Sequence, residues 1–146
     1  MNMRTISRFV LLTIVGLLGA ISAAAQTGPF QFYAIAPCRA VDTRGGPAVG
    51  QGVTRDFAIR GTCGVPTSAK AVSLNVTVVS PTQGSFLTLW PSGGARPNVS
   101  TINFASTDVS LGNGAIVAVS TAANDLSVFN CCGDVHVILD VTGYFQ

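Results

Sequence analysis

The stretch AVSLNVTVV, residues 71–79, alternates apolar and polar side chains along its whole length. Its apolar members share one side of an extended chain, and they are Val72, Leu74, Val76 and Val78. Successive side chains of a β-strand point to opposite faces, so this two-residue period is typical of a strand with one buried face. The stretch predicts a strand whose apolar side packs against a core.

Similar short apolar segments recur on both sides of this strand, between clusters of Gly, Pro, Asn and Ser. The further predicted strands are 30–36, 54–60, 84–90, 100–104, 115–120, 126–130 and 135–144. The last has a mixed second face, which is typical of a central strand. A chain of about eight short strands without a helical period predicts an all-β protein, a single-domain antiparallel β-sandwich over residues 26–146.

The first 25 residues have the pattern of a secretory signal peptide. Arg4 and Arg8 precede an uncharged apolar run, 9–21, and three alanines follow at 23–25. The run is shorter than the roughly 20 residues that span a membrane. We therefore expect cleavage before Gln26 and a secreted, extracellular or cell-surface protein. The alternative is a retained membrane anchor.

The net positive charge of the chain comes from this leader. The 146 residues carry eight Lys and Arg, six Asp and no Glu. Without Arg4 and Arg8, six basic residues face six Asp, so the mature chain has no formal imbalance. Nucleic acid and anionic lipid are thus not expected partners, because both attract basic surfaces. The mature chain also has no apolar run long enough for a membrane span.

The four cysteines are Cys38, Cys63, Cys131 and Cys132. Disulfides form and persist in exported proteins. A bond between the adjacent Cys131 and Cys132 would close a small strained ring, so we predict a Cys38–Cys63 disulfide. The adjacent pair is then a redox-sensitive pair, an intermolecular link or two buried thiols.

Three ordered motifs resemble one family. They are PCRAVDTR at 37–44, GTCGVP at 61–66 with the strand that follows, and VHVILDVTGYF at 135–145. The chain is similar to the uncharacterised β-rich modules of exported bacterial proteins, with a PCR-x-x-DTR opening and a DV-x-GYF ending. The resemblance implies no catalytic role. It places Cys38 and Cys63 at the two cysteine positions of the family, whereas Cys131-Cys132 departs from its pattern.

The densest charged cluster belongs to the first motif. Asp42 and Arg44 share a face if the segment is extended, and Asp140 needs a partner if it is buried in the last strand. We predict a structural ion-pair network in which Arg39 or Arg44 meets Asp42 or Asp140. The alternative is a pair of arginines that binds a carboxylate or a sugar.

Catalytic and metal chemistry have little support in the sequence. His136 is the only histidine, no G-x-S-x-G turn surrounds a serine, and adjacent cysteines lack the spacing of a zinc knuckle. We therefore predict no enzyme activity, catalytic residue, metal or cofactor. The predicted function is an exported structural or interaction module, with a glycan or a cell-surface protein as the partner.

Two alternative functions follow from particular residues. A carbohydrate-binding module would stack a sugar on an exposed Trp90, with Arg96 in the loop beside it. A self-assembling surface or fibre subunit would add its aromatic N-terminal strand, around residues 30–33, to the sheet edge of a neighbour.

Overall fold

The computed structural model describes residues 28–146, which fold into eight strands and one short 3-10 turn. The predicted leader lies outside the described residues. The strands are β1 (Phe32–Asp42), β2 (Thr54–Phe57), β3 (Ala71–Val79), β4 (Ser85–Pro91), β5 (Ile102–Phe104), β6 (Ser110–Ala118), β7 (Leu126–Asn130) and β8 (His136–Phe145). The prediction of an all-β sandwich is confirmed.

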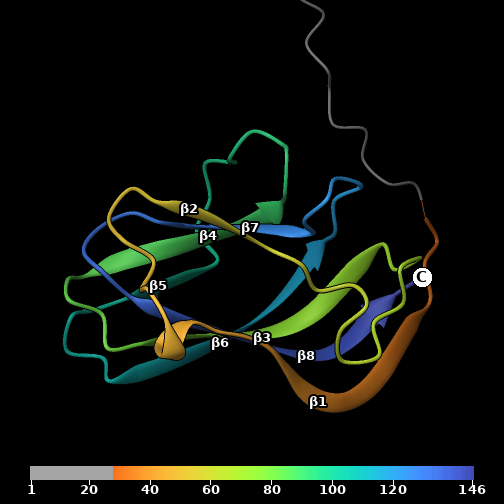
Figure 1. Ribbon diagram of the computed structural model, residues 1–146, viewed down its shortest axis with the longest axis horizontal. Coiled ribbons are helices and arrows are strands. Elements are labelled where there is room, and N and C mark those ends of the chain that lie inside the picture. Colours follow the sequence, from red (N-terminus) through yellow and green to blue (C-terminus); the bar gives the residue numbers. More distant parts are fainter. Residues whose placement is uncertain (1–27) are drawn as a thin grey trace, which may run out of the picture.

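Two antiparallel four-stranded sheets pack face to face (Figure 1). The first sheet has the order β1-β8-β3-β6 and the second has the order β2-β7-β4-β5. As predicted, β8 is a central strand, with β1 on one side and β3 on the other. The backbones of Gln31 and Gln146 exchange two hydrogen bonds, so the first and last described segments lie side by side.

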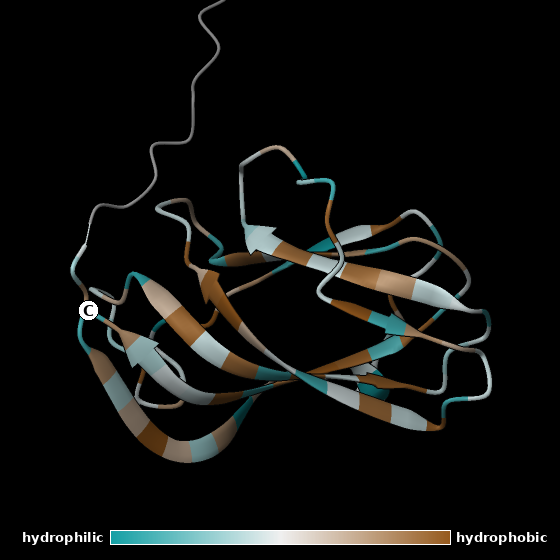
Figure 2. Cartoon of the chain, turned by 180° about the vertical axis from the view of Figure 1, so that it is seen from behind, coloured by the Kyte–Doolittle hydropathy of each residue, from teal (hydrophilic) through white to brown (hydrophobic). Residues whose placement is uncertain are grey.

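The core lies between the sheets and follows the alternation of the strands, which Figure 2 shows as bands of hydrophobic and hydrophilic residues. The inward side chains of β3 and β8 are at most 2% exposed, and they are Val72, Leu74, Val76, Val78, Val137, Leu139 and Val141. They form one cluster with Leu87, Leu89, Leu126 and Val128 of the second sheet. Each such side chain stabilises the fold by about 1.5–3 kcal/mol relative to exposure.

Two strands differ most from their predicted bounds, and β2 ends at Phe57 instead of residue 60. β1 continues to Asp42 because a bulge between Ala34 and Cys38 admits Pro37 into the strand, where an edge position tolerates the missing N–H. β6 begins at Ser110 instead of residue 115, so Gly112 and Gly114 are strand residues.

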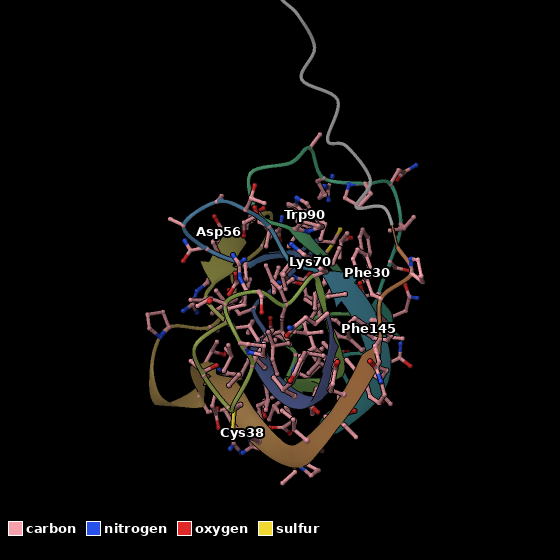
Figure 3. All side chains as sticks on the ribbon, turned by 90° about the vertical axis from the view of Figure 1, so that its right-hand side faces the viewer. Phe30, Cys38, Asp56, Lys70, Trp90 and Phe145 are labelled. Carbon is pink, nitrogen blue, oxygen red and sulfur yellow. A yellow bond between two sulfur atoms is a disulfide. The ribbon has the colours of Figure 1, made fainter. Side chains whose placement is uncertain are left out.

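The predicted disulfide between Cys38 and Cys63 is confirmed, with its Cα atoms 5.6 Å apart. It joins β1 to the loop between β2 and β3, and Figure 3 shows its yellow bond beside the bend of β1. Closing a loop of this length stabilises a fold by about 3 kcal/mol in the chain-entropy model.

Candidate functional site

The four charged residues of the predicted network meet on the outer face of the first sheet. Arg39 and Asp140 are cross-strand neighbours, and the guanidinium donates from Nε to Oδ1 at 2.8 Å and from Nη2 to Oδ2 at 3.2 Å. Arg44 Nη2 lies 2.6 Å from Asp42 Oδ2, and Arg39 Nη1 lies 3.5 Å from the same oxygen. The Asp140 side chain is 23% exposed and that of Arg39 is 48% exposed, so the network lies at the surface.

The local geometry at Asp42 differs from the extended segment that the sequence suggested. Asp42 ends β1 and caps the 3-10 turn Thr43–Gly45, where its carboxylate accepts the backbone N–H of Arg44. The turn brings the Arg44 side chain back onto the same carboxylate. These hydrogen bonds, first from the side chain and then from the backbone of Arg44, hold the pKa of Asp42 below its usual range.

The network covers an apolar side chain of the outer face. Ile138 points away from the core of the sandwich, yet it is only 4% exposed. Its cross-strand neighbours are Asp42 on β1 and Thr77 on β3. Asp42 is thus the register partner of Ile138 on β1, and Asp140 lies two residues further along β8 on the same face.

A second ion pair, which the sequence analysis did not predict, is buried. Asp125 is 3% exposed, and its Oδ1 accepts from Arg60 Nε at 2.5 Å. Its Oδ2 accepts the backbone N–H groups of Ile59 and Arg60, each at 2.6 Å. Arg60 also donates to the carbonyl of Ser120. The only signal in the sequence was an aspartate directly before the apolar strand β7.

Trp90 lacks the exposure that the carbohydrate-binding alternative requires. Trp90 is 7% exposed, and its indole N–H donates to the carbonyl of Gly94 at 3.0 Å, because the loop after β4 folds back over the ring. Arg96 places its guanidinium 3.7 Å from the centre of the Phe129 ring, a cation–π contact. The two residues therefore do not form an open stacking site for a sugar.

His136 is part of the scaffold. Its Nδ1 lies 3.0 Å from the carbonyl oxygen and 3.3 Å from the hydroxyl oxygen of Thr43. That hydroxyl accepts the backbone N–H of Val137, and Thr43 is 4% exposed. The histidine thus fastens the 3-10 turn to the start of β8.

The aromatic N-terminal strand is paired within its own chain. Phe32 and Tyr33 lie opposite Phe145 and Tyr144 of β8, with ring centres 5.0 and 5.2 Å apart. The Phe32 ring covers Gly143 so closely that a Cβ on this glycine would collide with the ring atoms. One side of residues 32–33 is therefore occupied by β8, and the other side of β1 is an edge of the sheet.

One of the two edges of the first sheet is β6, a strand of nine residues that pairs only with β3. Just beyond the two ends of this ladder, the backbone N–H of Val119 donates to the carbonyl of Lys70, and the backbone N–H of Ser80 donates to the carbonyl of Val109. Hydrogen-bonded pairs alternate along an antiparallel ladder, so the odd-numbered residues of β6 bond to β3. The outward N–H and C=O groups belong to Ser110, Gly112, Gly114, Ile116 and Ala118.

Two shallow hollows border β6. The first lies on the outer face of the sheet, between Thr142 of β8 and the exposed Ile116. The second lies at the seam between the sheets, where Asn113 donates to the carbonyl of Thr101. An edge strand with open backbone groups and a hollow on either side is the arrangement that accepts an extended chain as an additional strand.

The other three edges are less open to pairing. β1 has two irregularities in its register and contains Pro37, which lacks an N–H. The edges of the second sheet are the four-residue β2 and the three-residue β5. Short, bulged or proline-containing edges are the usual means by which proteins avoid edge-to-edge association. We therefore take β6 as the candidate binding edge.

Within residues 28–146, no cluster of three or more His, Cys, Asp or Glu side chains is arranged to hold a metal ion. The same residues contain no helix with the length and apolarity of a membrane span. Neither a family model, nor a curated protein, nor a solved structure matches the chain.

Proposed function

We propose that the protein is an exported, non-catalytic interaction module of the cell surface or extracellular space, and that β6 is its binding edge. The observation that carries the proposal is the open backbone of β6. This strand has no charged residue and no proline, the two features that usually block such an edge. Its outward groups are ready to pair with another strand.

Two features support export. The leader has the charge, the apolar run and the small residues of a signal peptide. The second is the Cys38–Cys63 disulfide, because disulfides form and persist in oxidising compartments outside the cytoplasm. Both also agree with the resemblance to exported β-rich modules.

The occupant that we propose for the edge is β6 of a second copy. Two antiparallel edges related by a two-fold axis pair the same residues in both directions. With Gly114 opposite Gly114, Gly112 lies opposite Ile116 of the partner copy. The edge is uncharged, and the basic and acidic residues of 28–146 balance, so charge does not oppose the approach of two copies.

This contact makes a closed pair. Once the two β6 edges have joined, each copy is left with the bulged edge of β1 and the short edges of β2 and β5. A fibre would need a second open edge on each copy. The pairing joins two four-stranded sheets into one continuous sheet of eight strands.

The experiment is the solution mass of the exported protein across a concentration series, measured by light scattering. We expect a dimer that Ile116→Lys and Gly114→Pro both convert to a monomer. The lysine places a charge on the edge, and the proline removes an outward N–H without disturbing the pairing with β3. Val99→Lys is the matched control, because it adds the same charge at an exposed site in the loop after β4.

A protein that stays monomeric throughout the series would contradict the proposed occupant. A dimer that survives both edge substitutions would contradict the assignment of β6. Circular dichroism of each variant shows whether the sandwich has kept its fold, so that a loss of folding is not mistaken for a loss of association.

A further inference from the structure

Cys131 and Cys132 are adjacent, half-buried and directed at each other. Their Sγ atoms are 2.6 Å apart, well inside the separation of atoms in ordinary non-bonded contact. They follow β7 at the turn that leads into β8. Neither cysteine takes part in the Cys38–Cys63 disulfide.

The surrounding backbone holds the pair in place. The N–H of Cys131 donates to the carbonyl of Phe86, and the N–H of Cys132 donates to the hydroxyl of Ser85 at 2.9 Å. The next residue is Gly133, which has a φ of 58°, and a Cβ there would lie 2.6 Å from the Thr82 hydroxyl. The turn is therefore fixed before and after the two sulfurs.

We infer that Cys131 and Cys132 are a thiol–disulfide exchange site that closes into a disulfide between neighbours. One thiolate attacks a disulfide reagent, small or protein-borne, to form a mixed disulfide and release one thiol of the reagent. The second thiolate then attacks the sulfur of its neighbour and releases the other thiol. Two protein thiols are oxidised, one reagent disulfide is reduced to two thiols, and two protons pass from the protein to the reagent.

The same geometry makes the bond reversible. Neighbouring Cα atoms are about 3.8 Å apart across a trans peptide, whereas unstrained disulfides span about 4.4–6.8 Å. The Cα atoms of Cys38 and Cys63 are 5.6 Å apart, inside that range. Strained disulfides are reduced more easily. The protein thus combines a structural disulfide with an exchangeable one.

The surroundings of the sulfurs affect how readily they react. The hydrogen bond with Cys132, and then burial, raise the pKa of the Cys131 thiol. Arg96 lies near enough to lower it in part. A raised pKa lowers the fraction of Cys131 thiolate, so its attack on a disulfide reagent should become faster as the pH rises.

The test is thiol alkylation and mass spectrometry of the exported protein. After treatment with oxidised glutathione, we expect no alkylated cysteine, no retained glutathione and a peptide with a Cys131–Cys132 bond. A graded series of reduced glutathione should then expose these two thiols before Cys38 and Cys63. The variants Cys131→Ser and Cys132→Ser should each retain one glutathione, because no neighbouring thiol can release it.

Three results would overturn the inference. The first is two alkylated thiols after oxidation, and the second is glutathione retained by the wild-type protein. The third is a Cys131 or Cys132 bond between two copies, seen as a dimer on a non-reducing gel. The β6 pairing predicts a dimer that reductant leaves intact, so the two proposals fail independently.

Discussion

Asp125 and Arg60 meet in the interior at one end of the sandwich, 65 residues apart in the chain, with one carboxylate oxygen 2.5 Å from Nε. The carboxylate also receives two backbone N–H groups, and the guanidinium reaches the Ser120 carbonyl. The pair therefore joins the loop after β2 to the start of β7. It satisfies polar backbone groups that would otherwise be buried without partners.

The first prediction concerns this pair. Asp125→Asn should lower the free energy of unfolding by about 3 kcal/mol, because it removes the counter-charge of Arg60, whose side chain is only 21% exposed, and the buried carboxylate that two backbone N–H groups contact. Urea unfolding followed by circular dichroism measures the change. A midpoint equal to that of the wild type would show that the pair does not hold the loop.

The second prediction concerns the surface network. Asp140→Asn should destabilise the protein much less than Asp125→Asn, because the Arg39 side chain is 48% exposed and water replaces the lost contact. The same urea experiment provides the comparison. Equal losses for the two variants would mean that the network is as critical as the buried pair.

The third prediction concerns pH. Arg44 lowers the pKa of Asp42 in the folded protein, from an ordinary value of 3.8. The folded state therefore releases this proton more readily than the unfolded chain, and the stabilisation is fully present above the ordinary pKa. It is lost as the pH falls from that value through the lower folded pKa.

Thermal unfolding of the wild type and Asp42→Asn at descending pH measures this contribution. The wild type should have the higher Tm near neutral pH, and the difference should shrink as the pH falls below about 4. A difference that stays constant to the lowest pH would contradict the role of the ionised carboxylate.

The fourth prediction concerns Gly143. Its replacement by alanine places a methyl group against the Phe32 ring and the Tyr33 carbonyl, so β1 must shift from β8. Overpacking of this kind costs about 1–3 kcal/mol. Phe32→Ala in the same chain should recover part of the loss, and the Tyr33 carbonyl should prevent full recovery. Calorimetry of the single and double variants separates the two contacts.

Strands with a strict alternation were predictable from the sequence. The bounds of β3 and β7 agree with the predicted ranges. β3 alternates apolar and polar residues, and β7 is bounded by clear turn residues. β6 was predicted only in its second half. Gly112 and Gly114 favour turns in isolation, and their place in a strand depends on the pairing with β3.

The contacts of the candidate site were harder to predict than the strands, because they depend more on tertiary structure. The Cys38–Cys63 bond could be predicted because a bond between the adjacent Cys131 and Cys132 would be strained, and because the resemblance places Cys38 and Cys63 at the two cysteine positions of the family. The hydrogen bond of the buried Trp90 could not be predicted, since it depends on how the loop that carries Gly94 folds back. The Asp125–Arg60 pair gave no local pattern, because its members come from distant segments that only the folded sandwich brings together.

The paired backbones of Gln31 and Gln146 determine how the fold responds to a mechanical load. Tension applied between these two residues acts across the β1–β8 ladder and peels it open one residue pair at a time, beginning at Phe32 and Phe145. The peeling reaches Cys38 after Ala34, and there the covalent link transfers the load to Cys63 and the loop that it anchors. The first extension under force should therefore be short, and reductant should lengthen it.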